Sequence, residues 1–284
     1  MWKNILGHKK QIDQLKKSLM EKRLPHALLF SGIEGIGKHT IALRLAEALV
    51  GETKKFHPDI HLIEPVGTAI KVDTIRELKH KIYLHPLEGK AKVVLINKPE
   101  AMTEATANAL LKILEEPPQD TYFILISSQA GRLLPTIRSR CQTIDFSPLN
   151  ESDIEKYLEQ QGTPKEEAHQ RALVSQGSLK AALELNPELF EETKNRLEIL
   201  LKNPKPSLIF DLSEEWSHDD EKIPLILTML HHLWHRKIIA KDSAVTTEIR
   251  FKQWQSIQDA SRQLEFHANK QLLFENLLFT LAAQ

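Results

Sequence analysis

The sequence is poor in cysteine and in long apolar stretches. Cys141 is the single cysteine among 284 residues, so a disulfide within the chain and a cysteine-based zinc site are both excluded. No apolar run approaches the roughly 18 residues that a membrane span needs. The opening stretch, MWKNILGHKKQIDQ, lacks the apolar core of a secretory signal. These absences predict a soluble, cytoplasmic protein that has no zinc and no membrane partner.

An excess of charge of either sign is also lacking. Lys+Arg and Asp+Glu both number 38, which gives a formal net charge of zero. A dedicated DNA-binding domain would be strongly basic, so the charge balance argues against that class. Hydrophobic residues make up 41% and charged residues 27% of the chain, which is typical of a globular protein. The length exceeds that of a typical single domain and predicts two or three.

The first half alternates short apolar runs with amphipathic stretches. Runs of this kind suit strands of a parallel sheet that is buried on both faces. They occupy residues 26–31, 59–64, 92–97, 122–127 and 142–146. A helix is expected where Val72, Ile75, Leu78 and Ile82 share one face, with Thr74 and Glu77 as a capping box. Another is expected over 103–116, stopped by two prolines. The alternation predicts an α/β domain.

After Pro148 the pattern becomes helical. Helices are expected over residues 151–160, 164–174, 178–185 and 187–201. Pro204 and Pro206 mark a second boundary. The last helix, 272–281, is apolar on more than one face, which fits either the centre of a self-contained bundle or an oligomer interface. We therefore expect an α/β domain over 1–148, a small helical domain over 149–203 and a helical oligomerisation domain over 204–284.

A glycine-rich loop follows the first expected strand. Gly32, Gly35, Gly37 and Lys38 form the pattern GxxxxGK, and a helix begins directly after it. In such a P-loop the backbone N–H groups bind phosphate and the lysine reaches the outer phosphates. The next position normally carries a hydroxyl that binds Mg²⁺. Here His39 and Thr40 follow, and Thr40 lies about 100° further around the helix, so its hydroxyl is expected to point elsewhere.

A second departure concerns the acidic residue that holds Mg²⁺ in P-loop NTPases, which lies at the end of a buried strand. The expected strand 92–97 ends in Asn97, followed by Lys98 and Pro99. Asn97 carries no charge, and Lys98 would repel a metal ion. Glu100 is acidic but lies beyond the strand end. Both supports for Mg²⁺ are therefore missing together. Nucleotide binding stays open, and hydrolysis is not expected.

Two further segments carry a family resemblance. Residues 103–118 (TEATANALLKILEEPP) and 133–141 (LLPTIRSRC) resemble the NALLK-LEEPP and SRC motifs of bacterial DNA polymerase III clamp loader subunits. Shorter matches lie at 24–27, 57–59, 177–179 and 269–281, so that the resemblance spans nearly the whole chain, thinly between 187 and 267. Within the family, delta prime subunits resemble the ATPase subunits but lack the same Mg²⁺-binding groups. The chain is similar to that type. The cysteine zinc module of many family members is absent from 50–56.

The resemblance implies an AAA+ fold with a small helical domain and a C-terminal collar. It implies a non-hydrolysing subunit that needs no cofactor and works with gamma/tau-type ATPase subunits and a delta subunit to load a sliding clamp on primed DNA. The SRC arginine, Arg140, would act in trans on ATP in a neighbouring subunit. The competing interpretation is a surface arginine paired with a carboxylate, and Arg138 is the nearest rival. Lys180 falls where active relatives place a nucleotide-sensing arginine.

Other function classes make different predictions. An ATP-hydrolysing subunit of the gamma/tau type, or another P-loop ATPase or kinase, would need an acid near position 97. A metal site is not expected at His231, His232 and His235, because the metalloprotease pattern has glutamate in the second position. Cys141 is not expected to be a nucleophile, since it lies beside an apolar strand and no histidine partner is evident.

Overall fold

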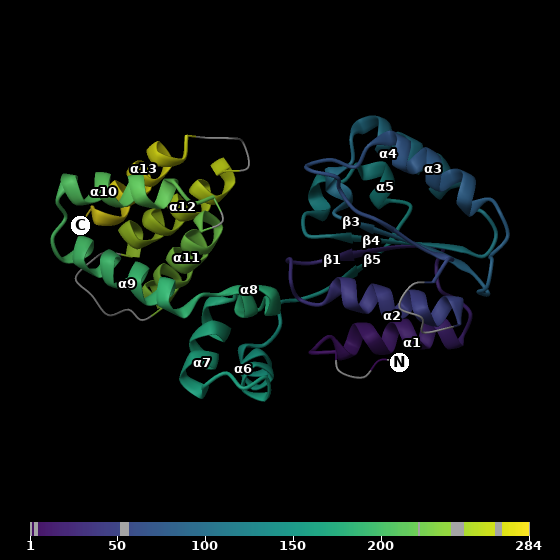
Figure 1. Ribbon diagram of the computed structural model, residues 1–284, viewed down its shortest axis with the longest axis horizontal. Helices are drawn as coiled ribbons and strands as arrows, with labels where there is room; N and C mark the ends of the chain where they lie inside the picture. The colour runs from purple at the N-terminus through teal and green to yellow at the C-terminus, as the bar shows by residue number, and fades with distance from the viewer. Residues whose placement is uncertain are drawn as a thin grey trace. The chain divides into compact units, whose positions relative to one another are not determined.

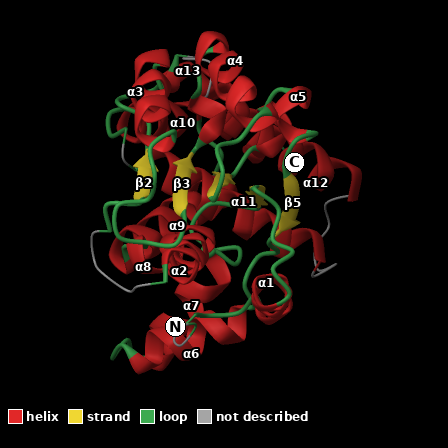
Figure 2. Cartoon of the chain, turned by 90° about the vertical axis from the view of Figure 1, so that its right-hand side faces the viewer, coloured by secondary structure: helices red, strands yellow, loops and turns green. Residues whose placement is uncertain are grey.

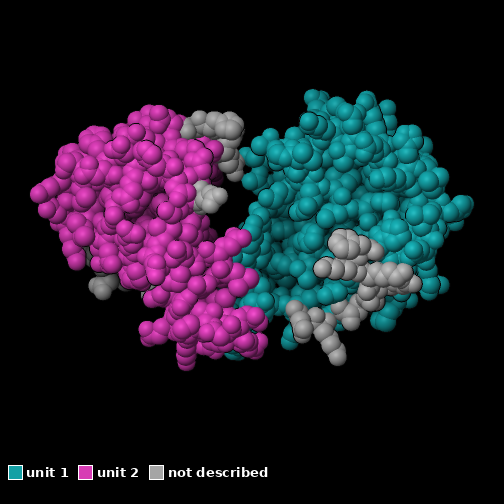
Figure 3. All heavy atoms as spheres, in the orientation of Figure 1, with its two compact units in different colours: residues 1–157, 177–180 teal, residues 158–176, 181–284 magenta. Residues whose placement is uncertain are grey.

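The chain forms two compact units in a computed structural model that describes residues 2, 5–51, 57–220, 222–239, 247–264 and 269–283. One unit comprises residues 1–157 with 177–180, and the other comprises 158–176 with 181–284 (Figure 3). The short segment 177–180 therefore belongs with the N-terminal unit although it lies far along the chain. The boundaries expected at 148 and 203 stay predictions.

A five-stranded parallel sheet forms the centre of the first unit. Its strands are β1 (Ala27–Ser31), β2 (Ile60–Ile63), β3 (Lys92–Asn97), β4 (Thr121–Ser127) and β5 (Gln142–Asp145). The order across the sheet is β2-β3-β4-β1-β5, and every neighbouring pair is parallel. The predicted α/β domain is confirmed. Because β1 lies between β4 and β5, the loop that follows it emerges inside the sheet rather than at an edge.

Helices cover both faces of this sheet, which is why the three inner strands β1, β3 and β4 are mostly apolar and buried. The elements are α1 (Lys9–Met20), α2 (Lys38–Val50), α3 (Val72–Ile82), the 3-10 turn η1 (Pro99–Ala101), α4 (Glu104–Glu115), the 3-10 turn η2 (Ala130–Arg132) and α5 (Pro135–Arg138). One face carries α1 and α2, and the other carries α3, α4 and α5 (Figures 1 and 2). Leu110 of α4, Ile137 of α5 and Phe123 of β4 are buried in the latter layer.

The starts of two helices test the predicted caps. Ile75, Leu78 and Ile82 are buried on one side of α3 as expected. The capping box of Thr74 and Glu77 is wrong, because α3 begins at Val72 and its N-cap is Lys71, which makes no side-chain cap bond. The apolar pattern fixes the face of a helix but leaves its first turn open by a few residues. In α4, by contrast, the Thr103 hydroxyl accepts a 3.3 Å hydrogen bond from the backbone N–H of Thr106.

The rest of the chain is helical, and no strand follows β5 among the described residues. The helices are α6 (Glu151–Gln160), α7 (Lys165–Val174), α8 (Leu179–Glu184), α9 (Pro187–Lys202), α10 (Pro206–Ser217), α11 (Ile223–Ile239), α12 (Thr247–Leu264) and α13 (Lys270–Ala282). In the second unit, α9 to α13 enclose one apolar core that includes Trp216, Trp234 and Phe274. None of the described helices is long and apolar enough to span a bilayer. The predicted all-α C-terminal region is confirmed.

The last helix is largely central to this core. The side chains that it buries are Leu273, Phe274, Leu277, Leu278 and Leu281. At the end of α13, the side chain of Gln253 in α12 forms hydrogen bonds to both α11 and the α13 terminus. Its Oε1 accepts from the indole N–H of Trp234 at 3.0 Å, and its Nε2 donates to the carbonyls of Leu281 and Ala283 at 3.1 and 3.0 Å. This buried amide satisfies carbonyls that the helix end would otherwise leave unpaired. Leu272 and Phe279 remain exposed, so burial on every side is not found in the single chain.

Candidate functional site

The glycine-rich loop connects β1 to α2, as the sequence predicts. Gly35 and Gly37 have φ angles of 81° and 100°, in the left-handed region that glycine adopts without steric cost. Gly37 is also the N-cap of α2 and makes no side-chain cap bond. The first amides of α2 therefore begin directly at the loop, in the arrangement by which P-loops bind phosphate.

Lys38 points into its own loop. Its side chain is buried, with 5% exposed, and its ammonium group donates to the carbonyl oxygens of Gly32 and Ile33 at 2.6 Å each. Burial lowers the pKa of Lys38 to about 8, against the opposing effect of the Glu34 and Glu100 carboxylates. A bound phosphate would have to draw this ammonium group away from the two carbonyls.

Two other segments close over the loop. The backbone N–H of Lys180 donates to the carbonyl of Gly35 at 3.2 Å, and a Cβ added to Gly35 would lie 2.2 Å from the Ser178 hydroxyl. From the other end of the chain, His8 Nε2 lies 2.8 Å from the Ile36 carbonyl. Burial lowers the pKa of His8, and the Lys38 charge adds to this. The neutral ring must then carry its proton on Nε2 to donate to that carbonyl.

A matched pair of glycine substitutions tests this packing. Gly35→Ala should lower the free energy of unfolding by about 2–3 kcal/mol, because it adds both left-handed strain and a clash. Gly37→Ala should cost only about 1 kcal/mol, since its φ is positive but no atom lies within 4 Å of the added Cβ. Chemical denaturation monitored by circular dichroism measures both. Equal losses would contradict close packing of Ser178 on the loop.

The end of β3 lacks a free acid and carries a lysine instead. The amide of Asn97 donates to Glu64 at 3.0 Å. The next residue, Lys98, lies 3.5 Å from the Glu34 carboxylate, and Lys180 lies 3.0 Å from the same oxygen. Glu34 thus joins the loop to two lysines. Although burial alone would raise the pKa of Glu34, Lys180 and Lys98 lower it overall. Lys98 therefore places a positive charge at this edge of the sheet, as the sequence predicts, and its ammonium group is paired with Glu34 of the loop.

Glu100 also belongs to this site, although it lies beyond the end of β3, where the sequence predicts no role for it in holding a metal ion. It lies in η1, and its carboxylate accepts hydrogen bonds from the Ser127 hydroxyl at 2.7 Å and from the Ser128 N–H and hydroxyl at 3.2 and 3.1 Å. Both serines lie at or just after the end of β4, which pairs with β3 in parallel. The sequence gives no direct signal of this contact, because it depends on two strand ends meeting at the same edge. These hydrogen bonds hold the Glu100 carboxylate against the end of β4.

The remaining predicted loop residues, His39 and Thr40, are exposed in the first turn of α2. Any contact that they make with a nucleotide stays a prediction.

Arg140 lies between α5 and β5, as the sequence predicts. Its Nη2 forms an ion pair with the carboxylate of Glu115, and its Nη1 donates to the Thr136 carbonyl at 3.0 Å. About a third of the Arg140 side chain is exposed, at 34%. The competing interpretation, an arginine paired with a carboxylate, therefore describes its contact in the single chain, and a role in trans stays a prediction. Arg138 is exposed, and within the described part of the chain it forms no ion pair.

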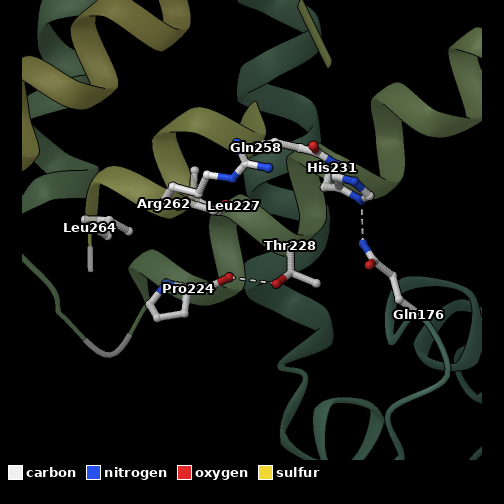
Figure 4. Close-up of a pocket in the computed structure, with 9 residues that line it drawn as sticks. Gln176, Pro224, Leu227, Thr228, His231, Gln258, Arg262 and Leu264 are labelled. Carbon is white, nitrogen blue, oxygen red and sulfur yellow. Dashed lines mark hydrogen bonds between the residues drawn. The ribbon is translucent and has the colours of Figure 1, made fainter. Parts of the chain in front are cut away.

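His231 is one of the residues that line a hollow of about 680 Å³ in the second unit (Figure 4). The indole N–H of Trp254 donates to His231 Nε2 at 3.1 Å, and the Gln176 amide lies 2.6 Å from Nδ1. Both ring nitrogens are thus engaged, which leaves this histidine no free nitrogen for a metal. The side chains of His232 and His235 lie outside the described residues.

Cys141 is buried beside β5. Burial raises the pKa of its thiol to about 11. The thiol is therefore protonated at neutral pH, and it lacks the thiolate character that a nucleophile needs.

Fold and loop together define an α/β P-loop domain of the AAA+ type, followed by a helical region. The model of the family described as DNA polymerase III, delta subunit, matches residues 7–150. The delta prime subunit of Bacillus subtilis DNA polymerase III is 29% identical, with 99% of this chain and 98% of that one covered. Its Escherichia coli counterpart is 33% identical, with 61% and 58% covered. A solved gamma subunit-related protein of Thermotoga maritima has the same fold, with a TM-score of 0.52, 21% identity, and 96% and 98% covered. The chain belongs to the DNA polymerase III delta prime family of clamp loader subunits that its motifs resemble.

Proposed function

We propose that the chain is a clamp loader subunit that does not hydrolyse ATP and that lends Arg140 to the ATP site of a neighbouring ATPase subunit. The absence of hydrolysis is proposed from the residues at the end of β3. There Asn97 is bonded to Glu64, and Lys98 is paired with Glu34 of the phosphate loop.

A divalent ion in a P-loop needs ligands from two parts of the protein. Mg²⁺ in a P-loop ATPase is held by a hydroxyl at the start of the helix and by a carboxylate at a strand end. This chain has His39 at the first position and Asn97 at the second. The Glu100 carboxylate, whose charge acts on Lys38, accepts hydrogen bonds from Ser127 and Ser128. ATP could enter the loop only without a firmly held metal ion, so the loop serves as a structural junction.

The partners follow from the family. Gamma/tau-type subunits would supply the hydrolysed ATP, and a delta subunit would complete the ring. The helical second unit would join the collar through side chains left exposed on α13, such as Leu272 and Phe279. The assembled ring would place a sliding clamp on primed DNA, and this chain needs no cofactor of its own in that work.

The second candidate is an ATP-hydrolysing subunit of the gamma/tau type. Two features favour it: the glycines and Lys38 of the loop are intact, and the charge of Glu100 acts on Lys38 by raising its pKa. If Glu100 exchanged its serine partners for a metal ion, the site would regain one acidic ligand. It would still lack the hydroxyl ligand at position 39.

One assay separates the two candidates. The purified chain, given ATP and Mg²⁺, should release phosphate no faster than buffer alone, and Lys38→Ala should behave identically. Steady release that Lys38→Ala abolishes would overturn the non-hydrolysing assignment. A crystal structure with ATP in which Mg²⁺ is bound between the loop and the end of β3 would do the same.

A further inference from the structure

The last residue of α4, Glu115, contacts Arg140, which lies 25 positions further along the chain. We propose that Glu115 is a positioning residue for Arg140 and fixes the guanidinium in the orientation in which it meets the neighbouring subunit's nucleotide. This inference rests on the proposed role of Arg140 in trans.

The backbone that carries Glu115 is held in place. Leu114, directly before it, is buried with 2% exposed, and its carbonyl lies 3.2 Å from Nε2 of His26, at the entry to β1. The helix ends at this point because Pro117 and Pro118 follow and cannot continue it. The negative end of the α4 dipole adds to the charge of the carboxylate, which favours a cation there.

The backbone that carries Arg140 is equally fixed. Ile137 and Cys141, on either side, are buried at 0% and 8%. The N–H of Arg140 donates to the Ile137 carbonyl at 3.1 Å, and that of Cys141 donates to the Arg138 carbonyl at 3.3 Å. Two fixed backbones therefore meet through one side-chain pair, so that the pair determines where the guanidinium points.

The pair leaves donors available. A guanidinium has five N–H groups, and Glu115 and Thr136 each accept one bond from Arg140. The other N–H groups remain on a partly exposed side chain, enough for two phosphate oxygens. Holding the side chain in one rotamer beforehand removes part of the entropy loss on meeting the phosphate. Among the residues that the structure describes, no carboxylate pairs with Arg138, so Arg140 is the better candidate.

The test uses the whole clamp loader, reconstituted with its ATPase subunits, clamp and primed DNA. Glu115→Gln removes the charge and keeps the size of the side chain. It should lower kcat for the ATP site that faces Arg140 about fivefold, with KM for ATP little changed, because an exposed ion pair of this kind has a modest effect. Glu116→Gln is the matched control. It removes the same charge one residue away, where the side chain is exposed, and should leave kcat as it is.

A double-mutant cycle separates positioning from other effects. In an Arg140→Ala background, Glu115→Gln should cause no further loss. If Glu115→Gln reduces turnover equally in both backgrounds, or leaves it unchanged while Arg140→Ala lowers it, the positioning role is overturned. If Arg140→Ala itself has no effect, the role of Arg140 in trans fails first. Thermal melting of each variant checks that it is folded.

Discussion

Arg140→Ala is expected to lower ATP turnover at the adjoining ATPase site by about 10³-fold, the lower end of the range for arginine fingers. The physical reason is that the guanidinium is always charged and can bond two phosphate oxygens as negative charge redistributes during transfer. The measurement is DNA-stimulated ATPase of the reconstituted loader, in which one site's share of hydrolysis should disappear. The chain keeps its fold, because the Arg140 side chain lies partly exposed at the surface.

Two companion variants sharpen this result. Arg138→Ala removes an exposed arginine two residues earlier and should leave turnover close to that of the wild type. Arg140→Lys keeps the charge but loses the planar fork, so it should recover only part of the activity. Unchanged turnover in Arg140→Ala would remove the chain from the chemistry of its neighbour. A larger loss in Arg138→Ala would transfer the role to that residue.

Asp59→Ala is expected to lower the free energy of unfolding by about 3–5 kcal/mol. Asp59 precedes β2 and is buried, with 1% exposed. Its carboxylate accepts three backbone hydrogen bonds, from the N–H groups of Leu87, Glu88 and Gly89 at 2.8 to 2.9 Å. Alanine would leave these donors without a partner. Urea denaturation measures the loss.

Asp73→Ala provides the comparison, because it deletes an exposed carboxylate in the first turn of α3 that pairs with Arg76. It should change stability by about 0.5 kcal/mol or less. Similar losses for Asp59→Ala and Asp73→Ala would show that the buried hydrogen bonds carry little energy.

The same carboxylate predicts a pH dependence. Burial alone would raise the pKa of Asp59, but the backbone N–H donors outweigh burial, and the pKa is lowered overall. The stabilisation is therefore complete above the ordinary carboxyl pKa of about 3.9. It is lost as the pH falls through the lower pKa of the folded state. The Asp59→Asn variant should lose less stability than the wild type below pH ~4. Identical acid unfolding would contradict this.

Much of the architecture was predictable from local pattern. Apolar runs predicted the strands, as in 92–97, because the central residues of a strand that is buried on both faces are apolar. The glycine pattern placed the phosphate loop between β1 and α2. The start of α3 was mistaken because several residues near Lys71 can begin a helix at similar cost, and the side chain of Thr74 makes no cap there.

The residues at the two positions that hold Mg²⁺ in P-loop NTPases were also determined by the sequence alone. His39 and Asn97 occupy positions where a metal ion needs a hydroxyl and a carboxylate, and no arrangement of the backbone can supply those groups. What only the tertiary structure decided is how the remaining charges are paired. Glu34 meets Lys180, 146 positions away, and Glu100 meets Ser127. Glu100 meets Ser127 because the parallel strands β3 and β4 bring their carboxyl ends to one edge of the sheet. Glu34 meets Lys180 because the segment 177–180 packs on the loop after β1. Neither the order of the strands nor this packing is encoded in any local stretch.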